Sequence, residues 1–218
     1  MVGETKFDIS NLNSKNPLKQ FESWYQDAKN AKSIKSPNCA CLATCSSNCE
    51  PSCRMIEINE FNDNGFLFFT HYDSKKARDL SQNRNCSLCF YWDQLDRQVV
   101  MCGRVEKISE KESMEFFQRR TVPQQLKTLA SQQGKVIKDK EVLVERQQKL
   151  AKEFEQSQRM PVPETYVGYL FKPEEFDFWQ GNVNDLDDRI RFRKRKQVED
   201  ESLVTMGEGN WAIERIGA

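Results

Sequence analysis

Short segments with β-strand character, separated by polar turns, are the feature that most restricts the fold. Residues 39–45, 53–61 and 66–72 are such segments, and the Asn-Asp-Asn-Gly turn at 62–65 leads into the third. Residues 85–108 form a fourth unit, a strand pair around a short polar loop. Turns of this length and composition connect strands that run in opposite directions. The region therefore predicts an antiparallel sheet.

Helical periodicity interrupts and flanks these strands. Two helix starts carry capping signals: Asp73 or Ser74 for one, and a capping box of Ser109 and Glu112 for another. Helices are expected at residues 16–32, 73–83, 109–121 and 139–157, and further strands at 160–181, 188–196 and 209–218. Five to seven antiparallel strands with inserted helices predict an α+β fold built around a small barrel.

The bulk composition suits one globular domain. The chain has 218 residues, 38% of them hydrophobic, and we expect a disordered tail at 1–15 and a single domain at 16–218. Lys+Arg and Asp+Glu are balanced at 33 each, which disfavours nucleic acid or an anionic membrane as a partner. We see neither an apolar stretch of about 18–20 residues nor a secretory signal, so the expected location is cytoplasmic.

Eight cysteines are unusually many, and five lie between Cys39 and Cys53. Their spacing lacks a C-x₂-C knuckle, and His71 is the only histidine, so we expect no metal site. We interpret residues 40–45 as a buried strand that uses cysteine as a small hydrophobe. Cys86 and Cys89 form a C-x-x-C, but on a strand their side chains would point to opposite faces.

No familiar catalytic motif is present, because the chain lacks a histidine-based triad and a glycine-rich phosphate loop. Cations do stand at predicted strand and helix ends, where a phosphate would be held. Two tryptophans could lie against a planar ring. On the last basic strand, arginines alternate with apolar residues, which favours a solvated strand face over a nucleic-acid patch. These candidates are Arg54, Lys75, Lys76, Arg120 and Arg189, with Trp92 and Trp179.

The order of segments resembles that of the pyridoxine/pyridoxamine 5′-phosphate oxidase family from residue 16 to the C-terminus. The resemblance implies an FMN-binding split β-barrel, antiparallel and Greek-key-like with peripheral helices, and a homodimer with FMN at the interface. It implies oxidation of pyridoxine or pyridoxamine 5′-phosphate to pyridoxal 5′-phosphate, with O₂ as acceptor, in vitamin B6 metabolism. The similar segments are NPLKQFESWYQDA, CLATC with PSCRMIEINEF, GFLFFTHYDSKKARDL, CFYWDQLDRQV, FFQRR with SQQ, EFDFWQG with DRIRF, and WAIERI.

The positions that the resemblance assigns to FMN are nearly all kept. One hydroxyl is lost at Gly134, where the family has serine, while both phosphate cations of the Ser-Arg-Lys motif survive as lysines. Charge-assisted hydrogen bonds are worth roughly 1.5–3 kcal/mol each, so we expect FMN to bind. The implied FMN residues are Arg54, Met55, Phe69, Thr70, Lys75, Lys76, Gln98, Gln133, Gly134, Trp179 and Arg189.

The positions that the resemblance assigns to the substrate are mostly changed. Where the family grips the substrate phosphate with Lys, Tyr, Arg and Ser, this chain has Asn59, Phe116, Arg120 and Gln124. Where the family's Arg and His hold the pyridine ring, it has Asp185 and Asp187. Only the arginine is kept. A carboxylate about 4 Å from an anionic group costs roughly 4 kcal/mol at an effective dielectric near 20. We therefore expect reduced turnover of the usual substrate and assign no catalytic residue.

Three functions stay open from the sequence. The first is the family activity, an FMN oxidase that forms pyridoxal 5′-phosphate. The second is a diverged paralogue that binds FMN and oxidises another small molecule. The third is a non-catalytic, flavin-binding dimer. The changed substrate positions weigh against the first, and the kept FMN positions weigh against a protein without flavin.

Overall fold

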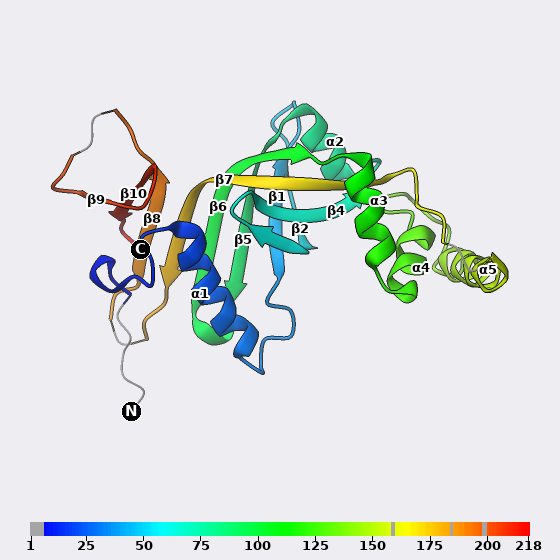
Figure 1. Cartoon of the computed structure of the whole chain (residues 1–218), viewed down its shortest axis with the longest axis horizontal. Coiled ribbons are helices and arrows are strands. Elements are labelled where there is room, and N and C mark those ends of the chain that lie inside the picture. Colours follow the sequence, from blue (N-terminus) through cyan, green and yellow to red (C-terminus); the bar gives the residue numbers. More distant parts are fainter. Residues whose placement is uncertain (1–6, 158–159, 184, 198–199) are drawn as a thin grey trace.

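The computed structural model describes residues 7–157, 160–183, 185–197 and 200–218. Ten strands and five α-helices follow one another along this part of the chain (Figure 1). The strands are β1 Cys39–Cys45, β2 Pro51–Glu57, β3 Glu60–Asn62, β4 Gly65–His71, β5 Asn85–Trp92, β6 Arg97–Lys107, β7 Tyr166–Gln180, β8 Asp188–Lys194, β9 Val204–Met206 and β10 Trp211–Arg215. The helices are α1 Pro17–Asn30, α2 Lys75–Gln82, α3 Glu110–Arg119, α4 Val122–Ala130 and α5 Glu141–Ser157, with short 3₁₀ turns at Ile9–Asn11 and Asp93–Leu95.

The ten described strands belong to one antiparallel sheet. Eight of them follow the order β2-β1-β5-β6-β7-β8-β10-β9, and β4 joins this path at β7 and carries β3 on its other edge. The long strand β7 is shared between two parts of this sheet. Its first half pairs with β4 and its second half pairs with β8, while β6 runs beside both halves with a register shift at Cys102/Gly103. The predicted α+β class and antiparallel split barrel are confirmed, with more strands than we expected.

The barrel is split between β2 and β4. β2 pairs with β1, β4 pairs with β3 and β7, and the structure gives no ladder joining β2 to β4. The Asn59 amide, between β2 and β3, donates to the Leu67 carbonyl at 2.9 Å and so extends the β3–β4 ladder by one bond. A seam with unpaired strand edges therefore runs along this side of the barrel.

Aromatic residues fill the barrel and fix α1 against it. Phe21 of α1 is fully buried and packs edge-on against Phe66 at 5.1 Å between ring centroids. Trp92 belongs to this core as well, and its Nε1 donates to a backbone carbonyl, so it is no ligand platform. Asn16 caps α1 and Ser74 caps α2, which decides between the two N-cap candidates of the second helix.

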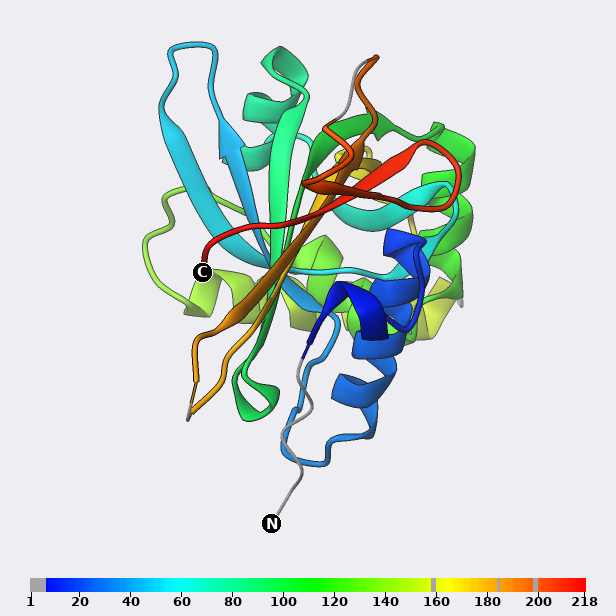
Figure 2. The ribbon, with the colours of Figure 1, turned by 90° about the vertical axis from the view of Figure 1, so that its left-hand side faces the viewer.

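Residues 7–15 depart from the expected disordered tail. Phe7 is buried, with its ring 4.7 Å from that of Trp24, and Asp8 forms an ion pair with Arg215 of β10. This segment, α1 and β10 lie together in both views (Figures 1 and 2). The contacts that order it come from far along the chain, which local composition does not reveal. The first six residues lie outside the described part of the chain.

Helix α4 was missed from the sequence. Thr121 and Gln124 form a capping box around its start, and Pro123 stands in its first turn, where proline is tolerated. A second, smaller core formed by Phe117, Leu129, Met160 and Tyr166 joins α3 and α4 to β7. No helix in the described residues is long and apolar enough to cross a membrane.

Candidate functional site

A cavity of about 300 Å³ lies at the seam between the edges of β2 and β4. Both strand edges contribute to its wall, and α2, the α3–α4 corner and the segment after α4 close it. The lining consists of Met55, Ile56, Glu57 and Asn59 on the β2 side, Phe69, Thr70 and His71 from β4, Lys76, Arg120, Lys127, Thr128, Ser131, Gln133 and Tyr166.

A buried ammonium without a counter-ion stands at one end of this cavity. Lys76, in the first turn of α2, is 8% exposed, and its Nζ donates to Thr70 Oγ1 and Gln133 Oε1, both at 3.2 Å. Burial lowers the pKa of Lys76, and the positive charge of Arg54 lowers it further. Within the described residues Lys76 forms no ion pair, so the site holds a positive charge that an anionic ligand would neutralise.

Arg54 is held beside Lys76 by the strand next to it. Its Nη1 donates to Thr44 Oγ1 at 2.8 Å and to the Leu42 carbonyl at 3.1 Å. Asp79 of α2 is the local carboxylate, 4.0 Å from Arg54 and 3.3 Å from Lys75. The charges of Arg54, Lys75 and Lys76 against the single carboxylate of Asp79 leave a net charge of about +2, which matches a phosphate monoester carrying roughly −1.5 to −2 at pH 7.

Stacked aromatic rings form the wall beyond the cations. Phe69 stacks with Tyr166, with ring centroids 5.2 Å apart, and with Phe116, at 3.9 Å. The Tyr166 hydroxyl is buried and has no hydrogen-bond partner among the described residues. Burial raises the pKa of Tyr166 to about 12, although nearby Arg120 acts in the opposite direction. A protonated, unpartnered hydroxyl in the cavity wall is a donor available to a ligand.

The corner between α3 and α4 supplies a second positive region. Arg120 caps the end of α3, and its Nη1 donates to Thr128 Oγ1 at 2.8 Å. Lys127 also lines the cavity from α4. His71 stands nearby at the end of β4, with Nδ1 2.8 Å from Thr165 Oγ1, and burial lowers its pKa. His71 is therefore neutral near pH 7.

A separate group of expected FMN residues lies far along the sheet. Gln98, Trp179 and Arg189 stand directly opposite one another on β6, β7 and β8. Arg189 makes a bidentate ion pair with Asp177, with contacts of 2.6 to 3.1 Å. Thr70 pairs with Val167, twelve residues before Trp179 on β7, which is up to roughly 40 Å of strand at about 3.3 Å per residue. One small molecule does not reach both groups within one chain.

The structure thus divides the expected site residues into two sets. In or beside the seam cavity lie Arg54, Met55, Phe69, Thr70, Lys75, Lys76, Gln133, Asn59 and Arg120. With the distant set lie Gln98, Trp179, Arg189, Asp185 and Asp187, the two aspartates in the loop between β7 and β8. Outside the lining fall Gly134, which has φ +78, Phe116, which lies behind Phe69, and Gln124, whose side chain caps α4.

Sequence reasoning missed several residues that line the cavity. Lys127 and Thr128 of α4 stand four and three residues before the C-cap residue Ser131, but this helical spacing is visible only once the helix is recognised. Tyr166 and Glu57 each lie in a strand, and no local sequence pattern indicates that they line a cavity.

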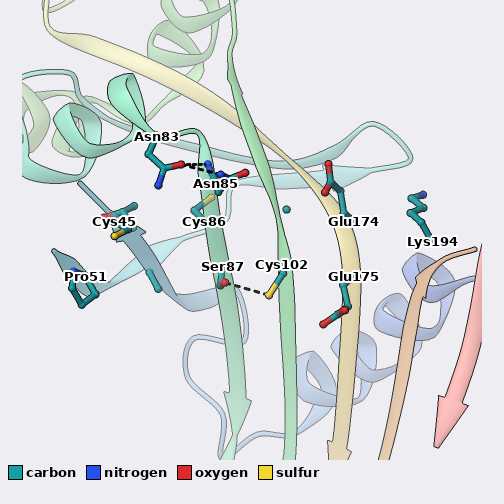
Figure 3. Close-up of a pocket in the computed structure, with 13 residues that line it drawn as sticks. Cys45, Pro51, Asn83, Asn85, Cys86, Ser87, Cys102, Glu174, Glu175 and Lys194 are labelled. Atoms are coloured by element: carbon teal, nitrogen blue, oxygen red, sulfur yellow. Dashed lines mark hydrogen bonds between the residues drawn. The ribbon is translucent and has the colours of Figure 1, made fainter. Parts of the chain in front are cut away.

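A larger cavity, of about 610 Å³, lies elsewhere on the sheet (Figure 3). It contains none of the expected site residues. Glu174, Glu175 and Lys194 line it, and Ser87 Oγ lies 3.4 Å from Cys102 Sγ across two strands. Two carboxylates against one lysine make it a poor site for an anionic cofactor.

The cysteines lie differently from our expectation for residues 40–45. Cys41 and Cys45 are half-buried on one face of β1, while Ala40 and Leu42 take the core positions of that strand. Every described cysteine is free, and the described residues contain no cluster of metal-ligating side chains. Cys86 is buried, and burial raises its pKa to about 12.

The chain forms a split antiparallel barrel, and the cavity at its open seam carries a net positive charge. These two features define a split-barrel protein whose cavity suits a phosphate-bearing ligand. Residues 27–180 match the family described as pyridoxamine 5′-phosphate oxidase, and residues 166–217 match its C-terminal dimerisation region. The chain belongs to the pyridoxamine 5′-phosphate oxidase family.

Named relatives agree with this assignment. The chain is 41% identical to the pyridoxine/pyridoxamine 5′-phosphate oxidase of Bombyx mori, over 94% of this chain and 81% of that protein. It is 38% identical to the pyridoxine-5′-phosphate oxidase of Bos taurus, over 96% and 81%. Among solved structures, PhzG from Burkholderia lata in complex with tetrahydrophenazine-1-carboxylic acid has the same fold, with a TM-score of 0.84, 24% identity and coverage of 99% and 98%.

Proposed function

We propose that this protein is an FMN-dependent oxidase that acts on pyridoxine or pyridoxamine 5′-phosphate, with lower turnover than its relatives. The observation that carries the proposal is the uncompensated Lys76 ammonium beside Arg54 in the seam cavity. Family membership and the names of the relatives support the reaction. The cytoplasmic location stays a prediction from the sequence.

FMN fits the residues at the seam. Arg54, Lys75 and Lys76 would hold its phosphate, and Thr70 and Gln133 would complete the shell of polar contacts. When bound, FMN supplies a two-electron acceptor that can be reoxidised by O₂. The net positive charge of this cluster explains why the chain would take a phosphorylated flavin in preference to the free riboflavin ring system.

A second copy of the chain would complete this site. Gln98, Trp179 and Arg189 are too far from Lys76 to touch the same FMN within one chain. Trp179 and Arg189 lie inside the region that matches the family's dimerisation region, residues 166–217. We therefore propose a homodimer in which each FMN contacts the seam of one copy and this distant set of the other. One continuous sheet runs through both matched regions, which supports a single domain.

The substrate side of the site explains the lower turnover. Arg120 faces the cavity and would hold an anionic group of the substrate. Asp185 and Asp187 sit beside the distant set, so the partner copy would bring carboxylates toward the substrate ring. Asp187 already accepts the Asn182 amide at 3.0 Å, which fixes its carboxylate in the loop. These two aspartates also favour one other function, the non-catalytic, flavin-binding dimer.

The test is a single sample measured two ways. Protein loaded with FMN is expected to show a flavin spectrum and to form pyridoxal 5′-phosphate and hydrogen peroxide from pyridoxine 5′-phosphate under air. Protein that takes up no FMN refutes the cofactor assignment. Protein that binds FMN but forms no product supports the non-catalytic candidate instead.

A further inference from the structure

The α3–α4 corner carries two cations that no described carboxylate neutralises. Arg120 and Lys127 both line the seam cavity, and neither forms an ion pair within the described residues. Arg120 is not free to swing away, because Thr128 accepts its Nη1 hydrogen bond at 2.8 Å. Thr128 in turn donates to the Gln124 carbonyl at 3.0 Å, so the support is part of the helix itself.

The position of Lys127 follows from the period of α4. Lys127 and Thr128 stand four and three residues before Ser131, the C-cap residue of α4, so all three lie on the side of the helix toward the cavity. Gln124 precedes them on that face, but its Oε1 accepts the Thr121 amide at 3.1 Å and closes the helix cap. Helix α4 therefore places the ammonium of Lys127 at the cavity, one turn after Gln124, whose side chain closes the helix cap.

The cavity thus has two positive regions rather than one. Lys76 marks the first, with Arg54 behind it, and the second is the pair Arg120 and Lys127. Among the described lining residues Glu57 carries the single carboxylate, and its Oε1 accepts a hydrogen bond from Asn38 Nδ2 at 3.2 Å. One phosphate would occupy the first region, which leaves the second available to another anionic group.

We propose that Lys127 adds a further cation to the substrate-phosphate subsite that the family resemblance assigns to Arg120, which is held in place by Thr128. The inference rests on the proposed function, since it names the part of the same cavity that holds the substrate. It makes Lys127 a specificity-determining residue that offsets the missing lysine at Asn59. The ammonium of Lys127 then strengthens the preference of the site for a phosphorylated ligand over its unphosphorylated analogue.

Binding rather than turnover tests the subsite. The FMN-loaded protein is titrated with pyridoxal 5′-phosphate and, separately, with pyridoxal, and the change in flavin absorbance is followed. The variants are Lys127→Ala, Lys127→Arg and the control Lys111→Ala, an exposed lysine on α3 that lines no described cavity. We expect Lys127→Ala to weaken binding of the phosphorylated ligand at least about tenfold, with pyridoxal unchanged. Lys127→Arg and Lys111→Ala should stay within about twofold of the parent protein.

Each other outcome has a distinct meaning. Equal binding of the two ligands by the parent protein, or an unchanged affinity in Lys127→Ala, overturns the inference. An equal loss for both ligands also overturns it, because the effect is then on the shape of the cavity and not on the phosphate. If the phosphorylated ligand binds in a Lys127-dependent way but pyridoxine 5′-phosphate is not oxidised, the proposed function fails while the subsite stands.

Discussion

Replacing Lys76 by methionine should weaken FMN binding without destabilising the protein that lacks FMN. The ammonium is 8% exposed, donates to two neutral oxygens and is repelled by Arg54. Removing a buried charge that has no counter-ion relieves a desolvation cost, while the methionine chain keeps the packing of the lysine stem. We expect the thermal midpoint of the apo protein to be unchanged or raised.

The loss in FMN affinity follows from the contact that is removed. A hydrogen bond between a charged donor and phosphate is worth roughly 1.5–3 kcal/mol, which corresponds to about 10- to 100-fold in the dissociation constant. Quenching of FMN fluorescence on titration with protein measures this constant. Lys75→Met is the comparison, because Lys75 is exposed and already paired with Asp79, so a smaller effect of below about 1 kcal/mol is expected. An apo protein that loses stability while its FMN affinity stays the same refutes the reasoning.

Three further predictions concern other parts of the molecule. Because burial lowers the pKa of His71 in the folded chain, His71 takes up its proton at a higher pH in the unfolded chain than in the folded one. Stability should therefore drop below about pH 6.5, and urea unfolding should show a weaker drop in His71→Gln. Phe7→Ala should cost roughly 3 kcal/mol of unfolding free energy, since its ring is buried against Trp24, and the same chemical denaturation detects this. Asp185→Arg combined with Asp187→His should raise kcat/KM for pyridoxine 5′-phosphate, and an unchanged value removes those aspartates as the cause of low turnover.

Local signals predicted much of this fold. The caps at Ser74 and Ser109, the helical period of α1 and the Asn-Asp-Asn-Gly turn each act within a few residues, so the sequence reveals them. The order of Phe7 depends on Trp24 and on the distant Phe178, and the joining of α4 to β7 depends on Tyr166, so no local pattern encodes either.

The sequence names candidate site residues but not how they are arranged in space, and their roles stay predictions. Arg54, Thr70 and Lys76 lie close together at one seam, and their role as ligands of one phosphate stays a prediction. The separation of Trp179 from them follows from the length and register of β7, which the sequence does not specify. Lys127 was missed because its orientation is defined only by the helix that carries it.

A mixing experiment tests most directly whether each FMN site is built from two copies of the chain. Lys76→Met removes the ammonium from the seam cavity. Arg189→Gln removes the guanidinium from the distant set but keeps a side-chain amide that can donate to Asp177. Each variant alone should bind FMN poorly. Random dimers of the two variants should regain about one quarter of the parent binding sites, because half of the dimers are mixed and each has one intact site. No recovery on mixing, or normal FMN binding by Arg189→Gln alone, would contradict the account.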